Sequence, residues 1–152
     1  MVLFINDKIE KQKIAKEILS KLPEWFGIPE STQEYIDNCI DMPFWIEKED
    51  NIIKGFITLK ETSIYTAEIY VMGVLKNYHN NGIGKMLFNA FYNYAKQHNY
   101  EFIQVKTVKQ GVYDIYDITN KFYKNLGFKE LECFPTLWDK SNPCQIYIKS
   151  IV

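Results

Sequence analysis

A glycine-marked connection between an apolar strand and an amphipathic helix constrains this chain more than any other feature. Residues 68–74 (Glu-Ile-Tyr-Val-Met-Gly-Val) predict a strand, and a polar loop leads from them to Gly82 and Gly84. Apolar side chains then recur at helical spacing through residue 98. Backbone N–H groups and the positive end of a helix dipole favour an anion at such a helix start. The sequence therefore predicts an anion site, in the first instance for phosphate, in this loop.

The remaining periodicities alternate between helical and strand spacing, which indicates an α/β fold. Helices are expected at residues 8–22, 31–40, 82–98 and 113–126, and strands at residues 2–5, 43–47, 52–60, 68–74, 101–107, 128–133 and 145–151. Ser31 and Glu34 have the spacing of a capping box at the start of the second helix. No linker or repeat divides the 152 residues, so one domain over residues 1–152 is expected.

Composition excludes several classes of protein. A formal net charge of -1 gives no electrostatic basis for binding nucleic acid or an anionic membrane surface. No apolar stretch approaches the ~20 residues of a membrane span, and we expect no signal peptide because charges begin at Asp7. The three cysteines show neither disulfide nor zinc spacing, so no metal is expected. The sequence predicts a soluble, cytoplasmic protein.

The glycine loop admits three interpretations from the residues alone. A dinucleotide-binding fingerprint needs a third glycine where this chain has Leu87, so that interpretation fails. A nucleotide-hydrolase phosphate loop needs a hydroxyl residue where this chain has Met86, so that one fails as well. An ordinary tight turn remains open beside the anion site. All 18 basic residues are lysine, so any phosphate must be held by backbone amides and lysines.

A second motif, further along the chain, bears on the choice between an anion site and an ordinary turn. Residues 79–84 (His-Asn-Asn-Gly-Ile-Gly) fall on the pattern Gln/Arg-x-x-Gly-x-Gly/Ala, and Phe122-Tyr123 with Gly127-Phe128 form an aromatic pair followed by Gly-Phe. Together they resemble the GNAT superfamily of acetyl-CoA-dependent N-acetyltransferases. The resemblance implies a single-domain GNAT-like α/β fold with a mixed, mostly antiparallel sheet and helices on both faces. It also implies transfer of an acetyl group from acetyl-CoA to a primary amine in a ternary complex.

The resemblance implies a set of acetyl-CoA-binding residues, with two departures from the family pattern. His79 stands where glutamine or arginine is usual, and Tyr116 stands where an asparagine often contacts the pantetheine arm. The expected acetyl-CoA contacts are Met72, Gly73, Val74, His79, Asn80, Asn81, Gly82, Ile83, Gly84, Lys85, Thr107 and Tyr116. Gly73 either lets the thioester approach closely or marks a bulge.

Two residues occupy the positions of the family's acid and base. Glu68 falls where several members place a general base, and Tyr123 falls where the family places the general acid for the CoA sulfur. The alternatives are a solvent-facing glutamate at a strand start and a tyrosine of the core. Glu24 is the other candidate base. A backbone N–H of residues 72–74 is expected to stabilise the oxyanion.

An aromatic loop with a carboxylate marks the expected acceptor site. Glu24, Trp25, Phe26 and Tyr35 suit a small cationic amine through charge and cation–π contact. Phe44 and Trp45 are expected in the core, and Trp138 in a loop beside the acceptor pocket. The expected partner is a small-molecule amine, and the protein is expected to be a monomer or homodimer. Acetylation of a protein lysine or N-terminus, or non-catalytic binding of acyl-CoA, are the alternatives.

Overall fold

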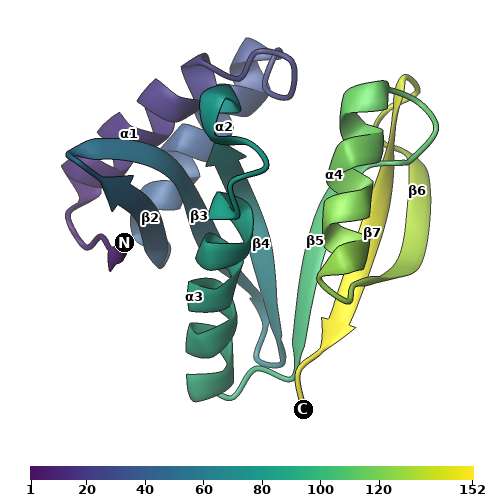
Figure 1. Cartoon of the computed structure of the whole chain (residues 1–152). Coiled ribbons are helices and arrows are strands. Elements are labelled where there is room, and N and C mark those ends of the chain that lie inside the picture. Colours follow the sequence, from purple (N-terminus) through teal and green to yellow (C-terminus); the bar gives the residue numbers. More distant parts are fainter. The chain divides into compact units, whose positions relative to one another are not determined.

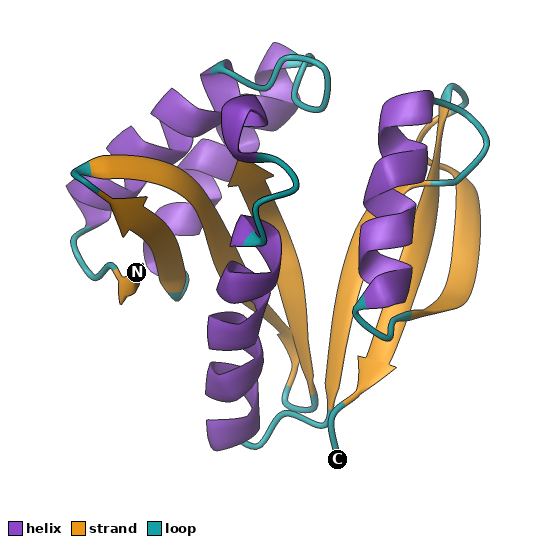
Figure 2. Ribbon diagram, viewed as in Figure 1, coloured by secondary structure: helices purple, strands orange, loops and turns teal.

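Seven strands alternate with four α-helices along the chain in the computed structural model, which describes residues 1–152 (Figures 1 and 2). The strands are β1 (Val2–Phe4), β2 (Phe44–Glu49), β3 (Ile52–Ser63), β4 (Thr66–Val74), β5 (Phe102–Val108), β6 (Lys129–Asp139) and β7 (Asn142–Ser150). The helices are α1 (Lys8–Ser20), α2 (Pro29–Asn38), α3 (Ile83–Gln97) and α4 (Asp114–Asn125), with 3-10 turns η1 (Cys39–Asp41) and η2 (Lys76–Tyr78). The chain divides into two compact units, residues 1–60 with 69–98 and residues 61–68 with 99–152. No helix is both long and apolar enough to span a bilayer.

The first unit sandwiches strands β1 to β4 between helices on both faces (Figure 1). Phe44 and Ile46 of β2 belong to the core that contains the apolar side chains of α1 and α2. Trp45, which points to the other face, contacts Phe91 of α3 with ring centroids 6.1 Å apart. Residues 44–47 are therefore all buried, because both faces of β2 are covered. The predicted α/β class with helices on both faces is confirmed, as is the core position of Phe44 and Trp45.

A buried lysine connects α1 to the segment that follows α2. The Nζ of Lys11 donates hydrogen bonds to the carbonyl groups of Ile40 at 3.2 Å and Met42 at 2.7 Å, and only 7% of Lys11 is exposed. Burial lowers the pKa of the Lys11 ammonium. These bonds tie α1 to the end of η1 and to the residue that follows it.

Helix α2 begins two residues earlier than the sequence predicts, and the predicted capping box is wrong. The N-cap residue is Ile28, which makes no side-chain cap, and Pro29 occupies the first helical turn. Proline suits that turn because its φ is preset and the missing N–H would have no helical acceptor. Ser31 therefore lies inside the helix.

The β2–β3 hairpin turns at Asp50 and Asn51, which both have positive φ, 51° and 64°. Two consecutive left-handed residues are typical of the tight turn that matches strand twist. The hairpin is confirmed, and its antiparallel pairs run from Phe44–Thr58 to Glu49–Ile52.

The second unit has the strand order β5-β7-β6, with helix α4 lying along β5 and β7 (Figure 1). Both strand pairs are antiparallel. β6 is an edge strand of 11 residues, and nearly all of it is exposed. It extends well past the predicted end at residue 133, because β6 and β7 form one long hairpin. Trp138 therefore lies in a strand, and its prediction as a loop residue is wrong.

Candidate active site

The loop between β4 and α3 has the geometry of an anion-binding helix start. Gly82 is the N-cap of α3 with φ +76°, makes no side-chain cap, and has no atom within 4 Å of the position of a Cβ. The Met86 N–H donates the first intrahelical bond, to the Gly82 carbonyl at 3.0 Å. The N–H groups of residues 83–85 consequently have no acceptor within the helix. This open, uncapped start fits a pyrophosphate, which the backbone N–H groups and the dipole would hold.

His79 makes a backbone contact that the sequence does not reveal. Its Nε2 lies 2.7 Å from the Val74 carbonyl oxygen, so Nε2 carries the proton and donates. Its ring meets the edge of Trp25 with centroids 5.7 Å apart. Only Nδ1 remains for a ligand, and in the neutral ring that nitrogen is an acceptor. Donation from His79 to a phosphate stays a prediction, and it requires the doubly protonated ring.

The predicted acceptor loop contacts the predicted cofactor loop through charged side chains as well. Glu24 Oε1 lies 2.6 Å from the Nζ of Lys76 in η2. This hydrogen bond lowers the pKa of the Glu24 carboxyl. A lowered pKa makes Glu24 a weaker base. Together with the contact between Trp25 and His79, the ion pair joins the two loops within the first unit.

An aromatic cluster connects the acceptor loop to α2 and β4. The Phe26 and Tyr35 ring centroids are 6.0 Å apart, and those of Tyr35 and Tyr70 are 5.2 Å apart. Asn38 Nδ2 donates to the Tyr70 hydroxyl at 2.9 Å, and the Lys60 ammonium lies over the Tyr70 ring at 5.4 Å. No sequence motif marks Tyr70. Strand alternation places it on the same face of β4 as Met72, and that was the available signal.

Trp25, Phe26 and Tyr35 also pack against the first unit's hydrophobic core, where they are partly buried. The three residues therefore have a structural role besides any contact with an acceptor. Their packing fixes the orientation of the rings.

Glu68 is buried beside two polar side chains of β5. Only 4% of Glu68 is exposed, and its Oε1 accepts a hydrogen bond from Gln104 Nε2 at 2.9 Å. The Nζ of Lys106 lies 3.4 Å from the same oxygen. Glu68 is therefore buried, and the alternative that it faces solvent at the start of a strand is wrong. No sequence motif marks Gln104 or Lys106 as partners of Glu68, because the sequence does not show which residues of another strand face it.

Tyr123 lies on the face of α4 that covers β7. It is 7% exposed, and its ring centroid lies 5.7 Å from that of Phe128 and 6.3 Å from that of Tyr147. The Phe128 N–H donates to the Tyr123 carbonyl at 3.1 Å, so the Gly-Phe motif also closes the end of α4. These contacts fix the orientation of the tyrosine ring.

A fully buried asparagine organises the rest of α4. Asn120 is 0% exposed, and its Nδ2 donates to the carbonyl groups of Val108 and Tyr116 at 2.9 and 2.6 Å. Its Oδ1 accepts the Tyr147 hydroxyl at 2.5 Å. Burial raises the pKa of Tyr147 to about 12, so this hydroxyl is a donor at neutral pH. No sequence motif marks Asn120, because two of its three partners, Val108 and Tyr147, lie on other elements.

Two further predicted cofactor residues flank this network. Thr107 of β5 is 5% exposed, and Tyr116 of α4 is half-buried, with its hydroxyl pKa raised by burial. Their contact with acetyl-CoA stays a prediction.

Close packing explains why position 73 is glycine, which neither of the two sequence interpretations of Gly73 considered. A Cβ at this position would lie 3.1 Å from Leu22 Cδ1, 3.2 Å from Ile18 Cγ2 and 3.4 Å from Phe56 Cε1. The residue thus allows α1 to approach β4 closely. Its backbone has no left-handed φ.

No group of three His, Cys, Asp or Glu side chains is placed to hold a metal ion. All three cysteines are free thiols. Burial raises the pKa of the Cys39 and Cys144 thiols to about 11, which disfavours a thiolate nucleophile at either position.

Solved structures share this fold at low sequence identity. A protein of Desulfovibrio desulfuricans described as an acetyltransferase of the GNAT family superposes with a TM-score of 0.83, at 15% identity over 100% of both chains. The aminoglycoside 6'-N-acetyltransferase of Enterococcus faecium gives 0.77, at 19% identity over 100% of this chain and 97% of that one. A Salmonella typhimurium protein described as an acetyltransferase, with its cofactor acetyl-CoA, gives 0.71, at 13% identity over 100% and 94%. The fold is that of the GNAT acetyltransferases.

Residues 41–130 match the family model described as an acetyltransferase (GNAT) domain. The chain belongs to the GNAT family and is an acetyl-CoA-dependent acetyltransferase. A search of curated protein sequences finds no match to it. The predicted family, fold class and enzyme class are confirmed, and structures of neighbours with acetyl-CoA support it as the co-substrate.

Proposed function

We propose that the protein transfers the acetyl group of acetyl-CoA to a primary amine of a small cationic molecule. The observation that carries this proposal is the contact between the acceptor loop and the cofactor loop, in which Trp25 meets His79 and Glu24 meets Lys76. Aromatic rings and a carboxylate beside the cofactor loop suit an ammonium-bearing substrate, which binds over the ring faces. The likeness in fold to an enzyme named for acetylating aminoglycosides supports a small-molecule acceptor.

The proposed acetyl-CoA site includes the β4–α3 loop and residues of β4, β5 and α4. The N–H groups of residues 83–85 and the Lys85 side chain would hold the pyrophosphate, with Asn80 and Asn81 completing the loop. The proposed pantetheine contacts are Met72, Gly73, Val74, Thr107 and Tyr116. When bound, acetyl-CoA supplies the acetyl group as a thioester.

We propose three roles for this chain's own groups. Glu68 takes the proton of the ammonium group, directly or through water, because an alkylammonium with a pKa of ~10 is not a nucleophile at neutral pH. A backbone N–H of residues 72–74 donates to the oxygen that gains negative charge. Tyr123 donates a proton to the departing sulfur. Glu68 is preferred to Glu24 because the Lys76 ammonium lowers the pKa of Glu24.

A screen of acetyl transfer tests the proposal. The purified chain is incubated with acetyl-CoA and with polyamines, aminoglycosides, amino acids or peptides, and released CoA is measured. Release with a small cationic amine supports the proposal. Release only with peptides would assign a protein lysine or N-terminus as the acceptor. Calorimetric binding of acetyl-CoA without release across the panel would assign a non-catalytic binder.

Two variants test the roles of the side chains. Tyr123→Phe should lower turnover by about 10²–10⁴-fold, as expected for loss of a general acid, with acetyl-CoA binding retained. Phe122→Tyr, on the same helix, is the control for altered packing. Glu68→Gln should flatten the pH–rate profile, whereas Glu24→Gln should leave its shape unchanged. Near-normal turnover of Tyr123→Phe would remove Tyr123 from the mechanism.

We also propose the cytoplasm as the location, supported by three free thiols, two of them buried. A monomer or a homodimer stays the prediction for the oligomeric state.

A further inference from the structure

We propose that Lys106 and Gln104 are positioning residues for Glu68, which hold its Oε1 atom and leave Oε2 free to take the proton of the acceptor. Both residues belong to β5 and lie two positions apart, so they share one face of the sheet. The inference rests on the proposed function, because it adds two residues to the base proposed there. It is carried by the unequal contacts of the two oxygens, by the burial of the carboxylate and by the place of the group in the second unit.

The two oxygens of the Glu68 carboxylate have different surroundings. Oε1 accepts from Gln104 Nε2 at 2.9 Å and lies 3.4 Å from Lys106 Nζ. Oε2 makes no hydrogen bond or ion pair, and the only fully buried side-chain oxygen without a partner belongs to Glu47. Solvent therefore reaches Oε2, although only 4% of Glu68 is exposed. A carboxylate held through one oxygen presents the other in a fixed direction, where its lone pairs can accept a proton.

Burial makes the charge of Lys106 necessary. Glu68 is removed from most of the water that would solvate its charge, and burial disfavours the ionised form. An ammonium group 3.4 Å away favours the ionised form and offsets this effect. A general base must be ionised before it can take a proton. Lys106 therefore keeps Glu68 available as a base, while its own side chain, 34% exposed, stays in contact with water.

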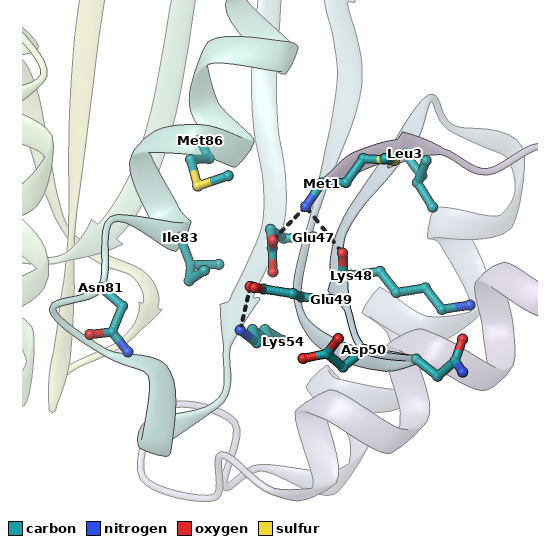
Figure 3. A pocket seen from close by; sticks show the side chains of 11 residues that line it. Met1, Leu3, Glu47, Lys48, Glu49, Asp50, Lys54, Asn81, Ile83 and Met86 are labelled. Carbon is teal, nitrogen blue, oxygen red and sulfur yellow. Dashed lines mark hydrogen bonds and ion pairs between the residues drawn. The ribbon is translucent and has the colours of Figure 1, made fainter.

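The exposed ion pairs of the chain differ from this one. Glu49 lies 2.9 Å from Lys54, and 61% of its side chain is exposed (Figure 3). Glu24, which pairs with Lys76, has a side chain that is 40% exposed. In each pair a hydrogen bond from the lysine lowers the pKa of a carboxyl group that water already keeps ionised. The lysine thus weakens an exposed base, whereas at Glu68 the lysine offsets burial.

The group lies on the face of the second unit's sheet that α4 does not cover. Tyr147 of β7 meets Tyr123 of α4, and Val105 of β5 pairs with Tyr147, so Val105 lies on the helix side. Gln104 and Lys106 alternate with Val105 and therefore lie on the other side (Figure 1). The helix consequently does not separate the carboxylate from solvent.

The second titratable group near Glu68 is the thiol of Cys144 on β7. Burial raises the pKa of this thiol to about 11, and Lys106 and Glu68 have smaller, opposite effects on it. The thiol is therefore neutral at neutral pH. Lys106 supplies the positive charge beside the carboxylate.

Other charged side chains of the adjoining strands have different partners or lie further away. On β3, Lys60 lies over an aromatic ring, and Glu61 accepts from the Tyr100 hydroxyl at 2.7 Å. Lys129 and Glu132 of β6 share the face of Lys106, but β7 separates their strand from β5, which places the two backbones about 10 Å apart.

The proposed step is a proton transfer. A proton of the acceptor's ammonium group passes to Oε2, directly or through one water, and leaves a neutral amine and a neutral carboxyl group. Lys106 keeps its own protons and remains an ammonium. Its charge then favours release of the proton from Glu68 to solvent, which restores the ionised base.

The pH dependence of kcat/KM for an acetylated amine tests Lys106. In Lys106→Met the acidic limb of the profile should move to higher pH by about one unit, because the carboxylate loses the cation that favours its ionised form. Activity below the limb should then fall about tenfold, with a smaller change on the plateau. Lys106→Arg keeps the cation and should restore the profile. Lys129→Met removes an exposed lysine from the same face and is the matched control.

The ratio of kcat to KM tests Gln104. Gln104→Leu should lower kcat about tenfold, because Oε1 loses a hydrogen bond and Oε2 is no longer held in one direction. The KM for acetyl-CoA should not change. Gln110→Leu, at an exposed glutamine, is the control and should behave like the wild type.

A nuclear magnetic resonance titration tests the same contact without catalysis. The signal of the Glu68 carboxyl carbon, assigned by its loss in Glu68→Gln, should titrate at higher pH in Lys106→Met than in the wild type or in Lys129→Met. Lys106→Gln replaces Lys106→Met if the latter folds poorly.

Two results separate this inference from the proposed function. If Glu68→Gln flattens the pH–rate profile but the lysine variants leave both the profile and the titration of Glu68 unchanged, the inference is overturned and the proposed base stands. If Glu68→Gln leaves the profile unchanged, the proposed base itself is overturned.

Discussion

Alanine at position 73 should destabilise the protein although the substitution adds a single methyl group. The new Cβ would lie 3.1 to 3.4 Å from carbon atoms of Leu22, Ile18 and Phe56. Carbon atoms pack best at about 3.5–4.0 Å, so the contacts with Leu22 and Ile18 are too short and the one with Phe56 has no room to spare. Each of these side chains is at most 2% exposed, which leaves none of them room to move away.

The size of the effect follows from this crowding. Adding one methyl group to a well-packed core typically costs about 1–3 kcal/mol, and contacts on two sides place Gly73→Ala near about 2 kcal/mol. With a urea m-value of about 2 kcal/mol per molar, the unfolding midpoint should fall by about 1 M. The m-value itself should not change, because the core and the fold remain.

Urea unfolding followed by tryptophan fluorescence measures this shift. The Ile18→Ala background supplies the matched comparison, since it removes the Cγ2 atom that the new methyl group meets. Gly73→Ala should be milder in that background, with a coupling energy of about 0.5–3 kcal/mol in the double-mutant cycle. An unchanged midpoint for Gly73→Ala, or strict additivity with Ile18→Ala, would show that α1 does not approach β4 as closely as described.

Other side chains give further predictions. Tyr147→Phe should cost about 1–3 kcal/mol at pH 7, because the buried oxygen of Asn120 loses its donor, whereas Tyr113→Phe, at an exposed hydroxyl, should have little effect. Because burial raises the pKa of Tyr147 from 10.0 to about 12, the folded state binds more protons between these values, so wild-type stability falls as pH rises through this window. Chemical denaturation at several pH values should show a smaller fall in Tyr147→Phe, and an identical fall would contradict the assignment. Lys11→Met should lower the unfolding free energy by about 1–3 kcal/mol, since two carbonyl groups lose their donor. Lys16→Met, at an exposed position of the same helix, is its control, and equal effects would refute the role of the buried ammonium.

The local parts of the fold could be predicted because each depends on a short stretch of sequence. The start of α3 follows from Gly82, and the β2–β3 hairpin follows from polar residues between two apolar runs. Where local signals competed, prediction failed. Ser31 has the spacing of a cap, but Pro29 begins the helix earlier. β6 extends further than its own residues indicate because β7 pairs with it.

In the candidate site, too, some positions follow from local sequence motifs and others depend on tertiary contacts. Positions such as Glu68 and Tyr123 follow from motifs, since the motifs are contiguous. Their neighbours depend on which strands and helices meet, and no local pattern encodes that. Gln104 and Asn120 have no special signal of their own, and only the folded chain shows that their amides serve Glu68 and Tyr147.

The long exposed edge strand has a consequence for solubility. An unpaired edge offers its backbone groups to other chains and invites aggregation. β6 carries apolar Leu131 and Leu137 on its exposed surface, but it also has charged Glu130 and Glu132, and Pro135 interrupts its donors. Proline and charge on an edge strand hinder edge-to-edge pairing. Glu130, Glu132 and Pro135 therefore oppose the pairing of β6 with a strand of another chain.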